Sequence, residues 1–107
     1  MKTAIKLLLI ILVFATVVST WSAAEDMGAD LYKTKCAYCH GADGKGDTAA
    51  GKKMRVKDLG SAEVQAKSDA DLNAIISSGK APMPGYKGKL SAAQIASLVK
   101  YIRTLKK

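Results

Sequence analysis

The only two cysteines of the chain, Cys36 and Cys39, lie three positions apart, and its only histidine, His40, directly follows the second. In a helix this spacing brings both thiols onto one turn, with the imidazole beside them. The chain has 107 residues and no other cysteine or histidine, so it cannot build a second site of this kind by itself. Residues 36–40 are therefore the candidate functional site of the chain.

The segment CAYCH at residues 36–40 has the form C-x-x-C-H, which is the attachment signature of c-type haem. Each thiol can add to one of the two vinyl groups of the porphyrin, and the imidazole is then placed beneath the iron. Covalent linkage would hold a bulky cofactor in a domain too small to rely on its hydrophobic core alone. The motif predicts one haem c per chain, linked by thioethers to Cys36 and Cys39 and ligated by His40.

Two other kinds of site use the same residue types. A redox disulfide pair also has the form C-x-x-C, but it is typical of a motif that follows a strand, whereas a helix is expected here. A structural zinc site needs four protein ligands, and two cysteines with one histidine leave the set incomplete unless carboxylates join it. A disulfide, moreover, leaves the position of His40 unexplained.

The first residues of the chain have the pattern of an export signal peptide. Two lysines precede an apolar run at residues 7–18, and small residues at 22–24 stand before an acidic pair. We expect cleavage after Ala24, which gives a signal peptide at 1–24 and one domain at 25–107 in the periplasm or an equivalent exported compartment. An uncleaved membrane anchor is the alternative, although a spanning helix needs about 20 predominantly apolar residues and this run weakens at its threonines and serines.

The domain is expected to be all-α, with three or more short helices and no convincing strand. Apolar residues recur at helical spacing over residues 91–106, and Ser91 with Gln94 has the form of a capping box at the start of that helix. A second helix is expected over Asp69–Ser78, followed by a glycine that can take the left-handed stop conformation. A third is expected over residues 27–36.

Long loops join these helices. Residues 41–53 and 79–89 are too rich in glycine, proline and lysine for regular structure. Loops of this length are unusual in so small a domain unless they surround something. We therefore expect both loops to wrap around the haem.

Methionine is the leading candidate for the second axial ligand of the iron, because the chain has no second histidine and a thioether suits a histidine-ligated haem. Met83 lies between two prolines, so its backbone is stiff and can hold a sulfur in place at a small ordering cost. Met54 and Met27 lack such a rigid frame and are expected to fill the core, as most methionines do. The sequence predicts His40 and Met83 as the two iron ligands.

Together these residues resemble a class I c-type cytochrome, one of the small monohaem electron carriers with histidine and methionine ligands. The similarity covers essentially the whole domain and rests on CAYCH, on the Met-Pro dipeptide and on the ending LSAAQIASLVKYIRTL. It implies a cytochrome c fold in which the first and last helices cross at a close contact. Gly28 and Tyr32 match the first-helix positions of that contact, and Leu98 and Tyr101 match their partners.

The chain departs from this family after the haem motif. Many members have a proline there whose carbonyl accepts a hydrogen bond from the proximal imidazole, whereas this chain has GADGKGD. Another backbone carbonyl is expected to take that role, because a ligating imidazole is usually oriented by a second hydrogen bond. Five cations that follow the motif are candidate partners of the haem propionates: Lys45, Lys52, Lys53, Arg55 and Lys57. A lysine run, however, is more often a solvated surface.

With both axial positions filled by protein atoms, the accessible chemistry of the iron is a change of charge by one electron. We expect a monomeric, exported electron carrier that is not an enzyme and that docks transiently on acidic donor and acceptor proteins. Loss of residues 1–24 removes two of the 17 Lys and Arg and none of the nine acidic residues, so the formal charge falls from +8 to +6. Export, and the lack of aromatic residues among the lysines, argue against a nucleic-acid partner.

Two other functions stay open. If Met83 does not ligate the iron, an open distal site could bind peroxide or a diatomic gas, and the chain would be a haem enzyme or a gas sensor. No second histidine is present to serve as acid and base in peroxide chemistry. The third possibility is a haem-free interaction domain with a disulfide between Cys36 and Cys39.

Overall fold

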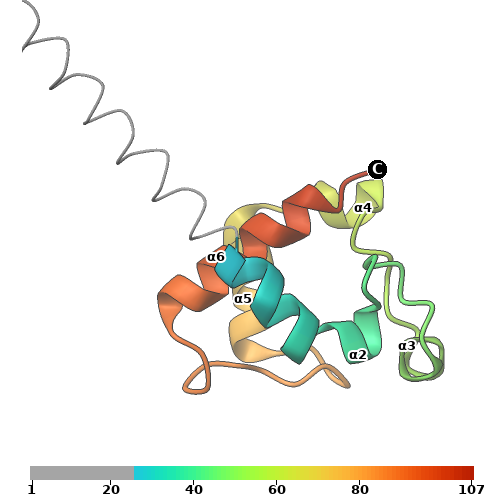
Figure 1. Ribbon diagram of the computed structural model, residues 1–107, viewed down its shortest axis with the longest axis horizontal. Helices are drawn as coiled ribbons and strands as arrows, with labels where there is room; N and C mark the ends of the chain where they lie inside the picture. Colours follow the sequence, from blue (N-terminus) through green and yellow to red (C-terminus); the bar gives the residue numbers. More distant parts are fainter. Residues whose placement is uncertain (1–25) are drawn as a thin grey trace, which may run out of the picture.

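The computed structural model describes residues 26–107, and the expected signal peptide at 1–24 lies outside them. Within the described range the chain is all-α, as expected, and it holds isolated bridges but no strand. None of the described helices is long and apolar enough to cross a bilayer. Figure 1 shows the order of the helices, which are residues 26–35, α2 (Ala37–His40), α3 (Ala49–Met54), α4 (Ala62–Gln65), α5 (Asp69–Ser78) and α6 (Ala92–Thr104).

The helix ends follow local sequence signals. α5 has the expected bounds, with the Ser68 hydroxyl accepting a hydrogen bond from the Asp71 N–H and Gly79 following at a φ of 78°. α6 begins with the expected capping box, in which the Ser91 hydroxyl accepts from the Gln94 N–H at 3.1 Å and the Gln94 side chain accepts from the Ser91 N–H at 2.8 Å. These caps satisfy backbone donors that a helix start leaves free.

Two expectations about the chain near the haem motif were wrong in detail. The helix expected over residues 27–36 ends at residue 35, and a turn at Cys36 separates it from α2. The segment 41–53, expected to be irregular, contains α3. This helix forms because Thr48 caps it and because Gly51, normally a poor helix former, is needed where α3 passes close to α2.

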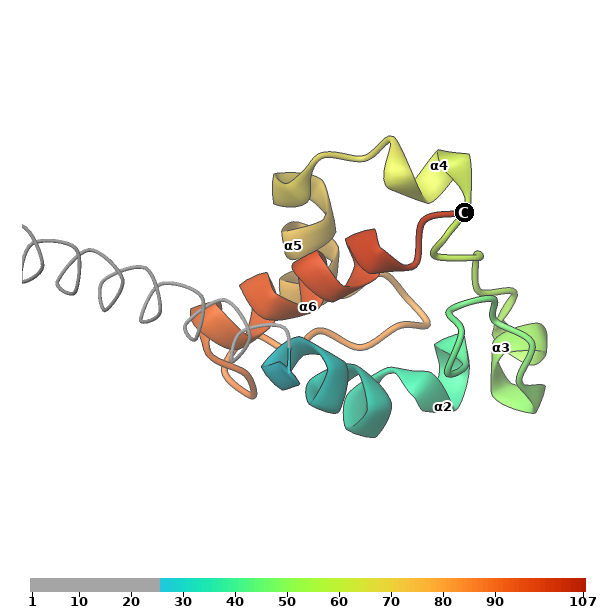
Figure 2. The ribbon, with the colours of Figure 1, turned by 45° about the horizontal axis from the view of Figure 1, so that its top comes forward.

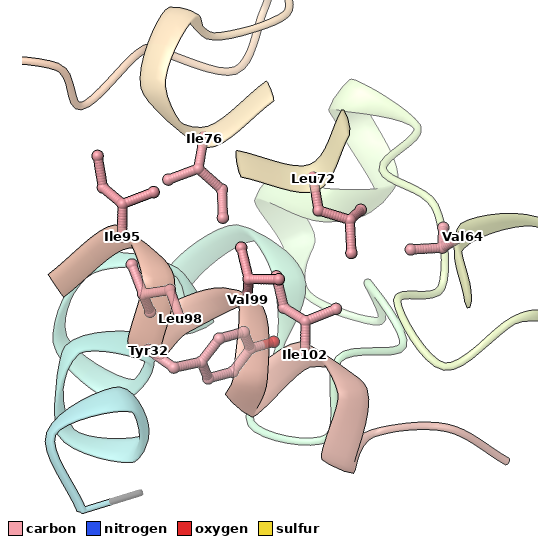
Figure 3. Close-up of a cluster of buried hydrophobic side chains, with 8 residues drawn as sticks. All are labelled: Tyr32, Val64, Leu72, Ile76, Ile95, Leu98, Val99 and Ile102. Carbon is pink, nitrogen blue, oxygen red and sulfur yellow. The ribbon is translucent and has the colours of Figure 1, made fainter. Parts of the chain in front are cut away.

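The hydrophobic core lies around α6, which is sandwiched between α5 and the helix at 26–35 (Figure 2). Side chains of α5 and α6 point toward one another, and the Tyr32 ring lies on the opposite side of α6 (Figure 3). Leu98 and Tyr32 are almost fully buried. The buried cluster consists of Tyr32, Val64, Leu72, Ile76, Ile95, Leu98, Val99 and Ile102.

The first described helix crosses α6 at a close contact, as the resemblance implied. A Cβ atom added to Gly28 would lie 2.5 Å from the Ser97 carbonyl oxygen and 3.3 Å from Tyr101 Cβ. One turn further along, the rings of Tyr32 and Tyr101 pack with centroids 4.7 Å apart. Glycine thus permits the backbone approach that brings these two aromatic rings together.

Arg103 of α6 holds α4 and the start of α5 in place. Its guanidinium donates to the Gln65 carbonyl oxygen at 2.9 Å, to the Lys67 carbonyl oxygen at 2.6 Å and to Asp69 Oδ1 at 2.8 and 2.9 Å. Gln65 in turn donates to the Ile102 carbonyl oxygen at 3.0 Å. The short helix α4, which is only four residues long, is therefore fixed by side chains far away in the sequence rather than by its own turns.

Candidate functional site

A cavity of about 350 Å³ opens between the haem motif and the core. Its wall includes both cysteines, His40 and Met83, which the sequence predicted as cofactor ligands. Most other lining side chains are apolar. The described helices all contribute to the wall, although α6 does so only through its C-terminal part, and the loop between α5 and α6 contributes as well. The structure thus brings all four predicted site residues to one cavity.

Three hydrogen bonds from outside α2 hold the backbone of residues 39–41, at the end of the haem motif. The Thr48 hydroxyl donates to the Cys39 carbonyl oxygen at 2.8 Å, and the Gly46 N–H donates to the His40 carbonyl oxygen at 2.8 Å. The buried Tyr32 hydroxyl donates to the Gly41 carbonyl oxygen at 2.6 Å. These bonds satisfy carbonyls that a helix end leaves free, so the orientation of Cys39 and His40 is determined by tertiary contacts.

Thr48 also ties α3 to α2. Its hydroxyl accepts a hydrogen bond from the Gly51 N–H at 2.8 Å while it donates to Cys39. A Cβ atom on Gly51 would lie 2.3 Å from the Cys39 carbonyl oxygen. Any side chain at this position would therefore force the backbone to shift. Thr48 was not among the residues predicted from the sequence, although its position immediately before two alanines is a recognisable cap signal.

His40 has the properties of a neutral ligand imidazole. Burial lowers the pKa of its ring below the usual value, which favours the uncharged form that binds metals. Its Nδ1 atom is buried and has no hydrogen-bond partner within residues 26–107. The backbone carbonyl expected to orient the ring is therefore not found there, and a ring nitrogen is left without a protein partner, a state that costs about 1–3 kcal/mol unless another group satisfies it.

The two thiols do not resemble a redox pair. The pKa of the Cys36 thiol is raised to about 11, mainly by burial and to a smaller extent by the charge of the neighbouring Cys39. Redox-active C-x-x-C motifs instead lower the pKa of one thiol so that it is a thiolate at neutral pH. Both cysteines are free, and no group of three or more His, Cys, Asp and Glu side chains that could hold a metal occurs in the described part of the chain.

The residues present fit a covalently attached haem. Two free thiols three residues apart, a neutral buried imidazole and a largely apolar wall are the groups such a cofactor needs, and the cavity size lies within the range of ligand pockets. The same donor set lacks the fourth ligand that a structural zinc site requires. Among the groups considered from the sequence, haem matches the cavity best.

Met83 lies in the wall of the cavity in the loop between α5 and α6. Its N–H donates to the Lys80 carbonyl oxygen at 2.8 Å, and the Lys80 N–H donates back to the Met83 carbonyl oxygen at 3.1 Å. Met54, expected to be core filler, also lines the cavity, from the last position of α3. Met83 packs against the hydrophobic core, whereas Met54 is not among the residues that do so.

Of the cations considered for the propionates, two reach the cavity. Arg55 and Lys57 line it, whereas Lys45, Lys52 and Lys53 do not. Arg55 follows α3 in the left-handed conformation, with a φ of 53°, which ends the helix at this point. The wall also includes three lysines that were not predicted from the sequence, Lys35, Lys67 and Lys80.

The buried phenol of Tyr32 should make the free energy of unfolding depend on pH in alkaline solution. Burial raises the pKa of its phenol well above the usual value of 10, so above pH 10 the unfolded chain releases this proton before the folded chain does. The stabilisation is present below about pH 10 and is lost as the pH rises toward the folded pKa, by at most about 1.4 kcal/mol per pH unit. Tyr32→Phe should lower the free energy of unfolding by about 1 kcal/mol at pH 7 and flatten its decline above pH 10.

Urea unfolding at pH 7 to 11 measures this effect. Tyr38→Phe is the matched control, because the Tyr38 side chain is 82% exposed. Parallel alkaline declines in the wild type and in Tyr32→Phe would contradict the assignment to Tyr32.

The chain is similar to c-type cytochromes in both sequence and fold. Residues 23–102 match the family model described as cytochrome c oxidase, cbb3-type, subunit III. Cytochrome c6 of Rippkaea orientalis is 34% identical over 95% of this chain and 92% of that protein. The solved KustC0563 c-type cytochrome is 34% identical, with a TM-score of 0.70 over 75% of this chain and 98% of that one.

A further relative is much longer. The cytochrome c subunit of the quinone alcohol dehydrogenase of Gluconacetobacter polyoxogenes is 35% identical over 84% of this chain. The chain spans about a fifth of that relative's length, since the match covers 21% of it. The similarity to this relative is therefore confined to one segment of it.

Proposed function

This chain belongs to the family of small class I c-type cytochromes, and on that premise we propose that it is an exported carrier of single electrons with His40 and Met83 as iron ligands. The observation that carries the proposal is the cavity wall, which brings Cys36, Cys39, His40 and Met83 together. When bound, the haem supplies an iron that gains and loses one electron. Its thioether links would be made by the two cysteines.

The protein's part is to keep the ligands of the iron the same in both oxidation states. His40 and the haem-motif backbone are held by hydrogen bonds from Tyr32, Gly46 and Thr48. Met83 is held by a loop that packs against the core. An iron held by His40 and Met83 would have no free position for a substrate, which favours a carrier over an enzyme.

The charge around the cavity supports docking on acidic redox partners. Five cations line its wall, and no aspartate or glutamate does. One of them, Lys57, forms an ion pair with Glu63, and both side chains are largely exposed. A potential of one sign around the opening would speed the encounter with an acidic donor or acceptor more than it strengthens the complex.

We place the mature domain at residues 25–107, outside the cytoplasm. The support is the signal-like pattern at residues 1–24 and the C-x-x-C-H motif, because haem attachment of this type fits an exported protein. In that compartment the acidic partners would be electron-transfer proteins.

The visible absorption spectrum, recorded with and without carbon monoxide, tests the proposal. The protein should be produced with a haem-attachment system, and its mass in urea should exceed that of the polypeptide by one haem. Sharp bands of the reduced protein that carbon monoxide leaves unchanged are expected, because His40 and Met83 would fill both axial positions of the iron. Bands that shift immediately would mean an open iron and would favour the enzyme or gas sensor, and a polypeptide mass alone would exclude the cytochrome.

A further inference from the structure

We propose that Tyr86 is a positioning residue that holds the Met83 loop across the opening of the cavity. The inference rests on the proposed ligation of the iron by Met83. Tyr86 lines the cavity three residues after Met83, and its hydroxyl donates to the Lys35 carbonyl oxygen at 3.1 Å. Lys35 is the residue immediately before Cys36, so this bond joins the methionine side of the cavity to the cysteine side.

The part of the loop that follows Met83 is fixed to α5 by backbone contacts. The Tyr86 N–H donates to the Ile76 carbonyl oxygen at 2.9 Å, and the Lys87 N–H donates to the Ser77 carbonyl oxygen at 3.0 Å. Gly85 lies so close to α5 that an added Cβ would be 2.7 Å from the Ser78 carbonyl carbon. The loop is therefore well anchored on the side that faces α5.

On the opposite side, the Tyr86 hydroxyl provides the connection. Among the hydrogen bonds found in residues 26–107, it is the one that links the loop at 79–90 to residues 26–41. Its acceptor is the carbonyl of the last residue of the helix at 26–35, where the turn at Cys36 interrupts the helical hydrogen bonding. The bond thus satisfies a helix-end carbonyl and at the same time spans the cavity.

Without this bond the loop would keep its contacts with α5 but could move away from the cysteine side. Movement of that kind lengthens the time for which the Met83 sulfur is away from the iron, and it leaves the thioether links and His40 unaffected. The consequence is faster entry of an external ligand, because such a ligand binds only the state in which the sulfur is displaced.

The rate at which imidazole binds the oxidised holoprotein tests the role of Tyr86. Tyr86→Phe removes one hydroxyl and keeps the ring, and the loss of one hydrogen bond should accelerate binding about threefold to tenfold. Tyr38→Phe removes the same hydroxyl from an exposed ring and should leave the rate unchanged. Ser91→Ala, which removes the cap of α6 away from the cavity, controls for a general loss of stability.

Each outcome decides between explanations. Acceleration in Tyr86→Phe alone supports the positioning role. An unchanged rate in Tyr86→Phe, or an equal acceleration in Ser91→Ala, would overturn it while leaving the electron-carrier proposal intact. If the wild type already binds imidazole as fast as Met83→Ala does, Met83 is not a ligand, and both the proposed ligation and the role of Tyr86 are wrong.

Discussion

Under the proposed ligation by Met83, replacing this residue with alanine is expected to free one coordination position, so that the reduced protein binds carbon monoxide at once. Carbon monoxide can bind only those molecules in which the sulfur is displaced from the iron. Its apparent affinity is therefore its intrinsic affinity multiplied by the fraction of molecules in that state. If the wild type is displaced about 1% of the time, removing the sulfur raises the apparent affinity about 100-fold. The reduction potential should also fall, because a thioether ligand raises the potential of a histidine-ligated haem.

Met54→Ala is the matched control, because Met54 lines the same cavity from α3. Carbon monoxide titration of the reduced protein and redox titration should give values close to those of the wild type for this variant. If the reduced protein binds carbon monoxide readily after Met54→Ala but not after Met83→Ala, the ligand has been assigned to the wrong methionine. If neither variant differs from a wild type that binds carbon monoxide readily, the second axial position is open in the native protein.

The second large effect is expected from Gly28→Ala. The added methyl group would lie 2.5 Å from the Ser97 carbonyl oxygen, which belongs to the backbone of α6 and cannot rotate away. The first helix and α6 would have to separate, which would also disturb the packing of Tyr32 on Tyr101. We expect a loss of about 3 kcal/mol in the free energy of unfolding, at the upper end of the usual cost of overpacking.

Thermal unfolding followed by circular dichroism measures this loss. A decrease of about 3 kcal/mol corresponds to roughly 12–24 °C in Tm for a domain of this size. Asp30→Ala lies on an exposed position of the same helix and should change stability by no more than about 0.5 kcal/mol. A Gly28→Ala protein with the Tm of the wild type would show that the two helices can separate without cost, contrary to the close contact described above.

Local signals in the sequence were sufficient for the long helices. The apolar periodicity and the Ser91 capping box located α6, and the flanking Ser68 and Gly79 gave α5 its bounds. Cys36, Cys39 and His40 could be assigned together because their chemistry depends on spacing along one helical turn. Gly28 and Tyr32 were found through family resemblance, and the structure confirmed their contact with α6.

Short elements could not be located in the same way. α3 and α4 have too few turns to be stable alone, and they form because Thr48 bonds to Cys39 and Arg103 bonds to the segment after Val64. The break at Cys36 was missed for a similar reason. Nothing near that residue in the sequence indicates a turn, whereas in the fold the preceding carbonyl receives the Tyr86 hydroxyl.

The sequence by itself determined which groups can hold the cofactor, because two thiols and an imidazole at fixed spacing are a local property of the chain. It also determined the main helices, whose periodicity and caps act over a few residues. Only the tertiary structure decided which methionines and cations line the cavity, and that a phenol from one loop reaches the carbonyl before the first cysteine. Those arrangements depend on contacts between residues far apart in the chain, and such contacts exist only after the helices have packed together.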